Sequence, residues 1–175
     1  MLLSALVAGV TIFAGIIFFH AGYSKVRHSA EYVDIMATYL GRPIRGTAVT
    51  AAGVCEMALA VMVLVPGVRW IGALGCSLLL TVYAVLMWRQ IQAGRRDMRC
   101  GCSGPAAETR IGPELILRNA VIAIPLFAVA FSQASLIPWV GMTLGLGFSF
   151  FLVLIYLSTD QIIANRQRLI CLLYT

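Results

Sequence analysis

Long runs without a charged residue dominate the pattern along the chain. Residues 1–24 and 119–159 contain no Asp, Glu, Lys or Arg. An α-helix needs about 20 apolar residues to cross a hydrocarbon core of about 30 Å, so each such run is a candidate membrane span. The second run is too long for one span and predicts two, with the break at Ser132-Gln133-Ala134-Ser135, shortly before Pro138.

Two further apolar runs form a predicted helical hairpin. Residues 46–68 are interrupted only by Glu56, and residues 70–88 follow the tight turn Pro66-Gly67-Val68-Arg69. The pattern therefore predicts one multi-pass domain over residues 1–175 that contains five helical spans. The predicted spans are 2–22, 47–66, 70–89, 113–132 and 136–158, followed by a C-terminal tail at 159–175.

The composition indicates the same class of protein. Hydrophobic residues make up 61% of the chain and charged residues 11%, compared with about 25% charged residues in average soluble proteins. The mean hydropathy is +0.92. We therefore expect an all-α integral membrane protein surrounded by membrane lipids. The net charge of +6 comes from basic residues in short loops between apolar runs, so nucleic acid is not an expected partner.

The placement of the basic residues predicts how the chain is oriented. Five spans place the loops 23–46 and 89–112 and the tail on one side, where they hold eleven Lys or Arg residues, whereas the other side holds only Arg69. Positive charge concentrates on the cytoplasmic side of membrane proteins. We therefore expect a multi-pass protein of the bacterial cytoplasmic membrane with its N-terminus outside. Basic residues follow the first span rather than precede it, which favours an anchor over a cleaved signal peptide.

Two cysteines stand close together in the second predicted cytoplasmic loop. Cys100 and Cys102 are separated by one glycine and directly follow Arg99. Neighbouring cations favour the thiolate, which is the nucleophilic form of cysteine. A disulfide across a single residue is strained and easily reduced, so it suits thiol–disulfide exchange better than structural stabilisation. The alternative interpretation is that both cysteines are reduced, unreactive loop residues. Zinc would need four ligands, and on that face only His28 would join the cysteines, so we expect no metal.

Another pair of cysteines lies inside the predicted hairpin. Cys55 and Cys76 are about eleven and about nine residues from the turn, which places them at similar depth in the membrane. If the two thiols touched, they could pass electrons by thiol–disulfide exchange within the bilayer. Cysteine is also a common small apolar residue of buried helix surfaces, and we favour this second interpretation.

Two charged residues fall within predicted spans. A carboxylate in the hydrocarbon is costly, so Glu56 indicates either a structural hydrogen bond to a neighbouring helix or a proton or quinone site. Arg118 lies about one turn into the fourth span and follows Glu114 by four residues, which is the favourable order for a helical ion pair. Arg118 would either anchor this helix end or steady a thiolate in the cysteine loop.

Four short stretches of the sequence resemble one group of small membrane proteins. "HAGYSKVRH" at the end of the first span and "VCEMALAVMVLVPG" around Glu56 resemble the DoxX superfamily. "CGCSG" followed by "LILRNAV" resembles more specifically its methylamine-utilisation MauE branch, in which a CGC-x-G loop precedes an Arg-Asn pair. The resemblance covers about residues 5–157. It implies a four-helix DoxX-like bundle plus a further transmembrane helix.

The resemblance also implies a redox role. It points to Cys100 and Cys102 as a redox pair that works with a thioredoxin-like, MauD-type partner in the maturation of a disulfide-rich extracytoplasmic protein. A cysteine loop in the cytoplasm and a client outside would require electrons to cross the membrane, for which the thiols of the hairpin are candidates. The other positions that match the motifs are Lys25, Glu56, Arg118 and Asn119.

Taken together, these features predict a membrane thiol–disulfide oxidoreductase. It would exchange electrons between a thioredoxin-like partner and either quinone or a cytoplasmic reductant. Quinone is the one cofactor that the sequence suggests. Two alternatives stay open: a non-catalytic accessory subunit of a larger membrane complex, and a quinone- or lipid-binding protein centred on Glu56.

Overall fold

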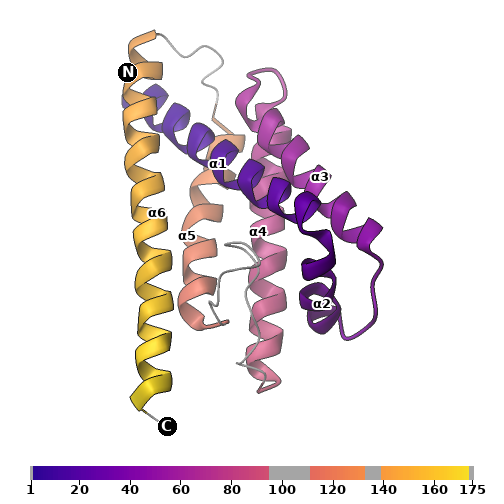
Figure 1. Ribbon diagram of the computed structural model, residues 1–175. Coiled ribbons are helices and arrows are strands. Elements are labelled where there is room, and N and C mark those ends of the chain that lie inside the picture. The colour runs from indigo at the N-terminus through magenta and orange to yellow at the C-terminus, as the bar shows by residue number, and fades with distance from the viewer. Residues whose placement is uncertain (1, 95–110, 133–138, 174–175) are drawn as a thin grey trace.

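Helices make up nearly all of the described part of the chain. The structure is a computed structural model that describes residues 2–94, 111–132 and 139–173, without the side chains of residues 168 and 170–173. No strand lies within these ranges. The helices are α1 (Leu2–Arg27), α2 (Ser29–Leu40), α3 (Gly46–Leu64), α4 (Arg69–Gln92), α5 (Pro113–Ala130) and α6 (Trp139–Leu173) (Figure 1).

Five of these helices, all except α2, are long and apolar enough to cross a membrane. The prediction of an all-α membrane protein with about five spans is therefore confirmed. The spans alternate in direction, so that the ends of α1, α4 and α6 and the starts of α3 and α5 lie at one end of the bundle (Figure 1). We call it the basic end, because it carries the exposed side chains of Arg27, Arg42, Arg45, Arg89 and Arg166.

Three helices extend further than the spans predicted from the sequence. α1 continues to Arg27, α4 continues to Gln92, and α6 runs through the expected tail to Leu173. The sequence after Thr159 contains no Gly or Pro before the end of α6, so nothing in it breaks the helix.

The loop expected at residues 23–46 contains an additional helix, α2. Tyr32 is its buried residue, and Gly41 ends it in the left-handed conformation with φ 64. α2 packs mainly against α3 and also touches α1 and α4. With 12 residues it is too short for a span. Hydropathy alone therefore does not reveal it.

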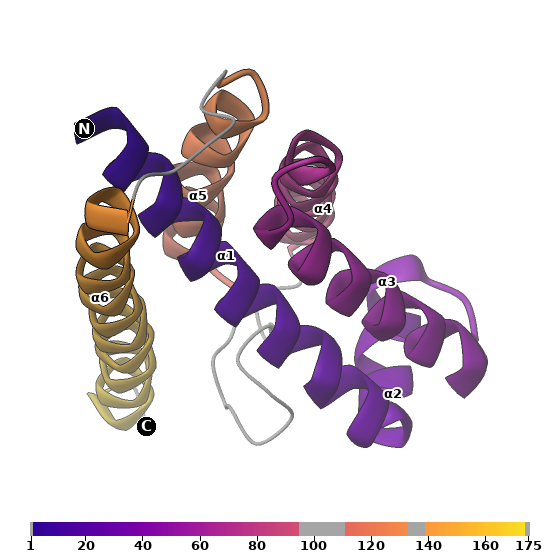
Figure 2. The ribbon, with the colours of Figure 1, turned by 90° about the horizontal axis from the view of Figure 1, so that it is seen from above.

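The helices are arranged around α1. α1 packs along α3 and along α6, whereas α4 packs against α3 and α5. Viewed from above, α1 crosses the bundle diagonally, with α6 near its start and α2 and α3 near its end (Figure 2). The core between the helices contains Phe18 of α1, Val63 of α3, Cys76 of α4 and Leu126 of α5.

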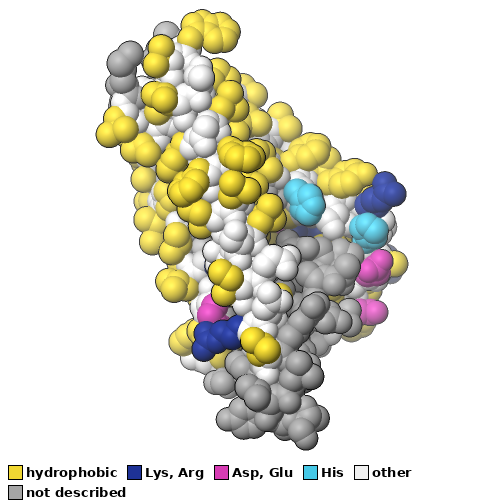
Figure 3. Space-filling view, turned by 60° about the vertical axis from the view of Figure 1, so that its left-hand side comes forward, with side chains coloured by type: hydrophobic (Ala, Val, Ile, Leu, Met, Phe, Trp, Pro, Cys, Tyr) yellow, Lys and Arg dark blue, Asp and Glu magenta, His cyan; other side chains and the backbone are white. Residues whose placement is uncertain are grey.

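Large apolar side chains cover the outer surface of the spans. Leu78, Ile124 and Phe150 are 65%, 70% and 67% exposed. Figure 3 shows hydrophobic side chains over the upper and middle parts of one face, while charged side chains gather towards its lower end and one edge. Such a continuous apolar surface would be unfavourable in water and is suited to lipid.

α1 and α3 cross closely at two glycines. A Cβ atom on Gly22 would lie 2.5 Å from the carbonyl oxygen of Gly53, and a Cβ atom on Gly53 would lie 2.7 Å from the carbonyl oxygen of Gly22. Small residues allow membrane helices to approach in this way. A Cβ atom on Gly53 would also lie 3.1 Å from the Cβ atom of Lys25, so glycine here leaves room for the lysine side chain.

We expect Gly53→Ala to lower the free energy of unfolding by about 1–3 kcal/mol, because the added methyl group meets backbone atoms of α1. Unfolding in mixed detergent micelles, followed by circular dichroism, measures the change. Gly147→Ala is the control, since a Cβ atom on Gly147 would meet nothing within 4 Å. Equal stability of Gly53→Ala and the wild type would contradict the close crossing.

Candidate functional site

A buried ion pair joins α1 and α3. The Nζ of Lys25 donates hydrogen bonds to Oε1 and Oε2 of Glu56, at 2.8 Å and 2.7 Å. Lys25 is 5% exposed and Glu56 is 1% exposed. The hydroxyl of Tyr83 in α4 donates a further hydrogen bond to Oε1 of Glu56. Three membrane-spanning helices therefore meet at one carboxylate.

Two tyrosine rings flank the ammonium group of this pair. The Nζ of Lys25 lies 5.8 Å from the ring centroid of Tyr32 in α2 and 5.4 Å from that of Tyr83. The faces of aromatic rings attract cations at such distances. The hydroxyl of Tyr32 is hydrogen-bonded in turn to the hydroxyl of Ser24, at 3.2 Å. α2 therefore covers the ion pair with an aromatic side chain.

This arrangement changes the interpretation of both charged residues. The sequence placed Lys25 in a polar loop, but the structure places it within α1 and turns it towards the interior. Burial of two charges is costly, and the pairing and the added hydrogen bond compensate for that cost. Glu56 has partners on two other helices, so a quinone bound at this carboxylate would have to displace them.

A second group of ion pairs connects α5 to α6. Nη1 of Arg118 lies 2.6 Å from Oδ1 of Asp160, and the guanidinium carbon lies 4.7 Å from the ring centroid of Tyr156. Arg166 pairs with Glu114 at 3.2 Å. The sequence suggested Glu114 as a partner of Arg118 within one helix. The structure shows that both residues form ion pairs with α6.

Asn119 follows Arg118 and is also buried, with 3% of its surface exposed. Its Nδ2 atom has no hydrogen-bond partner within the described part of the chain. A buried amide that makes no hydrogen bond is unfavourable. Asn119 is therefore a motif position with spare hydrogen-bonding capacity in this structure.

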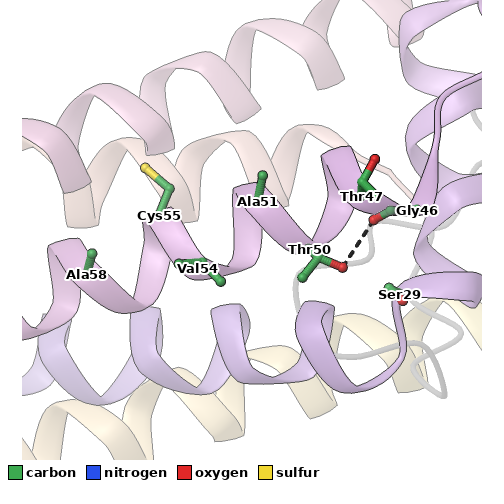
Figure 4. A pocket seen from close by; sticks show the side chains of 8 residues that line it. All are labelled: Ser29, Gly46, Thr47, Thr50, Ala51, Val54, Cys55 and Ala58. Carbon is green, nitrogen blue, oxygen red and sulfur yellow. Dashed lines mark hydrogen bonds between the residues drawn. The ribbon is translucent and has the colours of Figure 1, made fainter.

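The two thiols of the hairpin lie in different surroundings. Cys76 is completely buried in the hydrophobic core, as expected for a small apolar packing residue. Cys55 is exposed and lines a shallow pocket on α3 with Ala51 and Ala58, beside the hydrogen bond from Thr50 to Gly46 (Figure 4). Cys55 therefore differs from the buried packing residue that the sequence favoured. A thiol step between the two cysteines stays a prediction.

The segment that contains the predicted redox cysteines joins α4 to α5. Gly94 follows α4 in the left-handed conformation with φ 76, and Ile111 belongs to a buried cluster with Met87 and Ile163. The end of α4 and the start of α5 both lie at the basic end (Figure 1). Cys100, Cys102 and Arg99 themselves lie outside the described residues, so their geometry stays a prediction.

Several residues of these polar clusters were not predicted from the sequence, and Tyr83, Asp160 and Tyr32 show why. Tyr83 carried a usable signal, because the hydroxyl of a tyrosine in an apolar span needs a hydrogen-bond partner. Asp160 is the first charge after the long run 119–159, but its pairing depends on α6 continuing past the predicted span. Tyr32 lies on α2, a helix that hydropathy does not reveal, so its position beside Lys25 could not be predicted.

These features define a multi-pass α-helical membrane protein with a buried lysine–glutamate pair between its first two spans. Residues 3–133, which include nearly all of α1 and the whole of α2 to α5, match the family model "Methylamine utilisation protein MauE". The chain therefore belongs to the MauE family. The methylamine utilization protein MauE of Paracoccus denitrificans is 30% identical over 129 residues, which cover 73% of this chain and 69% of the relative. No solved structure matches the chain.

We expect Lys25→Met to lower the free energy of unfolding by about 3–5 kcal/mol, because the change leaves the carboxylate of Glu56 buried without its cation. The double variant Lys25→Met/Glu56→Met should recover most of this loss, since it removes both charges. Unfolding in mixed detergent micelles measures each variant.

Arg166→Met is the matched control, because its ion pair with Glu114 is exposed and should contribute at most about 1 kcal/mol. A double variant as unstable as Lys25→Met would show that the paired charges do not account for the loss.

Proposed function

We propose that this chain is a membrane thiol–disulfide exchange protein whose Cys100 and Cys102 exchange electrons with a thioredoxin-like partner. One observation carries the proposal: the sequence Cys-Gly-Cys directly follows Arg99 in a chain of the MauE family. The adjacent guanidinium favours a reactive thiolate. The single intervening residue favours a disulfide that is easily broken and formed again.

The exchange requires no group beyond two pairs of cysteines. A thiolate of the reduced pair attacks one sulfur of the oxidised pair, which forms a mixed disulfide and expels the other sulfur as a thiolate. The second thiolate of the attacking pair then breaks the mixed disulfide. The attacking pair ends as a disulfide and the other pair as a dithiol. Two electrons have passed between them, and the two protons lost by one pair balance the two gained by the other.

The described helices support this role because the two helices that flank the cysteine segment belong to a connected bundle. Lys25, Glu56 and Tyr83 connect α1, α3 and α4, while Arg118 and Asp160 connect α5 to α6. α4 and α5 pack against each other directly. The segment 95–110 therefore connects two helices that pack directly against each other.

The charge distribution supports a cellular setting for this chemistry. We place the basic end in the cytoplasm and the N-terminus outside, in the bacterial cytoplasmic membrane. The relative from Paracoccus denitrificans is named for methylamine utilisation. In line with the role that the sequence resemblance implies, we propose that this chain supports the maturation of an extracytoplasmic protein through its disulfides. Cys55 and Cys76 are candidate carriers if electrons cross the bilayer.

The Cys102→Ser variant should accumulate a mixed disulfide between Cys100 and the thioredoxin-like partner, because the thiol that resolves the intermediate is missing. Non-reducing electrophoresis of cell membranes, followed by mass spectrometry, detects this adduct. Cys171→Ser is the control, since it removes a thiol to which the proposal gives no role and leaves the pair intact. If Cys100→Ser/Cys102→Ser supported client maturation as well as the wild type, the chain would be an accessory subunit and the proposal would be wrong.

A membrane-impermeant maleimide should label Cys100 and Cys102 only from the cytoplasmic side, because the basic end faces the cytoplasm. The measurement uses sealed vesicles of both orientations and a background in which Cys55 and Cys171 are replaced by serine. Labelling before and after reduction also reports the redox state of the pair. Labelling from the outer side alone would reverse the proposed orientation.

A further inference from the structure

A long apolar groove runs between α1, α5 and α6. It encloses about 840 Å³ and is lined by apolar side chains that include Val10 and Phe13 of α1, Val121 of α5 and Leu152 of α6. Its lining residues on α6 extend from Phe148 to Gln167, which corresponds to about 28 Å of helix. The groove therefore follows α6 over nearly the full thickness of a hydrocarbon core. An occupant of matching shape is a long apolar chain.

Polar side chains line only one end of this groove. Glu114, Arg118, Thr159, Arg166 and Gln167 gather at the end that faces the basic end of the bundle. The opposite part is lined by residues such as Leu6, Pro125 and Phe148. An occupant is therefore expected to carry a polar head at one end of its apolar chain.

The charges at the polar end are balanced by pairing. Arg118 lies 2.6 Å from Asp160, and Arg166 lies 3.2 Å from Glu114, so two cations face two anions. An anionic phosphate would have to compete with both carboxylates. An uncharged head with hydrogen-bond acceptors fits better, because guanidinium, amide and hydroxyl groups can all donate to it.

Aromatic side chains add a preference for a ring. Phe13 and Tyr156 line the groove and contact each other edge to face, with ring centroids 6.1 Å apart. Arg118 lies over the ring of Tyr156. A flat, uncharged ring would therefore find aromatic and guanidinium surfaces at the point where the groove becomes polar.

We propose that this groove binds a membrane quinone, with its ring near Arg118 and Tyr156 and its tail along α5 and α6. We also propose that the quinone accepts electrons from Cys100 and Cys102, a role that rests on the proposed function. The two thiols lose two electrons and two protons and form a disulfide, while the quinone takes up both and becomes a quinol.

The chain connects this site to the cysteines. A Cβ atom on Gly112 would lie 2.5 Å from Oε2 of Glu114 and 3.9 Å from Nε2 of Gln167, so the start of α5 borders the polar end of the groove. Cys102 precedes Gly112 by ten residues, which span at most about 36 Å. The segment that contains the proposed electron donor therefore joins α5 beside the polar end of the groove.

Titration calorimetry of the full chain in detergent micelles with decylubiquinone tests the binding site. Leu152→Trp fills the groove from α6, and we expect it to raise the Kd about tenfold or more. Leu154→Trp is the matched control on the same helix, because Leu154 is exposed outside the groove lining and should leave the Kd unchanged. Equal Kd values for the two variants would overturn the proposal.

A second pair of variants tests the same site in case Leu152→Trp fails to fold. Val121→Trp fills the groove from α5 and should also weaken binding, whereas Ile124→Trp, outside the lining, should not. Melting temperatures of all four variants confirm that each is folded. Bound phosphatidylglycerol that decylubiquinone does not displace, detected by native mass spectrometry, would identify an anionic-lipid site instead and overturn the quinone proposal.

The cysteine variants separate this inference from the proposed function. Cys100→Ser/Cys102→Ser should bind decylubiquinone with the wild-type Kd, because the proposed contacts to the ring and the tail come from the described residues of α1, α5 and α6. The reduced wild type should convert decylubiquinone to its quinol, followed by ultraviolet absorbance, and this variant should not. Trapping of the partner without quinone binding would overturn the groove proposal alone, whereas quinone binding without trapping would overturn the thiol exchange alone.

Discussion

Polar groups inside a membrane-spanning bundle must find their partners within the protein, because the surrounding hydrocarbon offers none. The pairing of Lys25 with Glu56 meets this constraint at the centre of the structure. It requires α1 and α3 to approach closely, which Gly22 and Gly53 permit. It also draws in α4 through Tyr83, while α2 covers the pair with an aromatic side chain. Residues of four helices thus meet at one buried ion pair.

The position of α6 depends on other contacts. It lies beyond residues 3–133, which match the MauE family model, and it packs along α1. Its contact with α5 depends on ion pairs near the basic end, Arg118 with Asp160 and Arg166 with Glu114. Between these ion pairs and the apolar packing against α1 lies the long groove. The groove is therefore a product of the added helix rather than of the matched helices alone.

Particular residues show which features could be predicted from the sequence and which could not. The spans were predictable because a helix in hydrocarbon must be apolar over about 20 residues, and Glu56 was conspicuous because a carboxylate there is costly. Its partner was not predictable, because Lys25 lies at the end of an apolar run and resembles an ordinary loop residue. Asp160 was assigned to a tail for the same reason. Both charges became interior residues because their helices continue beyond the apolar run.

The sequence by itself determined the class of protein, its five spans and the concentration of positive charge at one end, because each depends on local composition. It also identified the family and the Cys-Gly-Cys pair. Only the tertiary structure decided which buried charges pair and where the groove forms. Those features depend on helix crossings and on side chains far apart in the chain, and the free energy of burying a charge depends on the partner that the fold supplies.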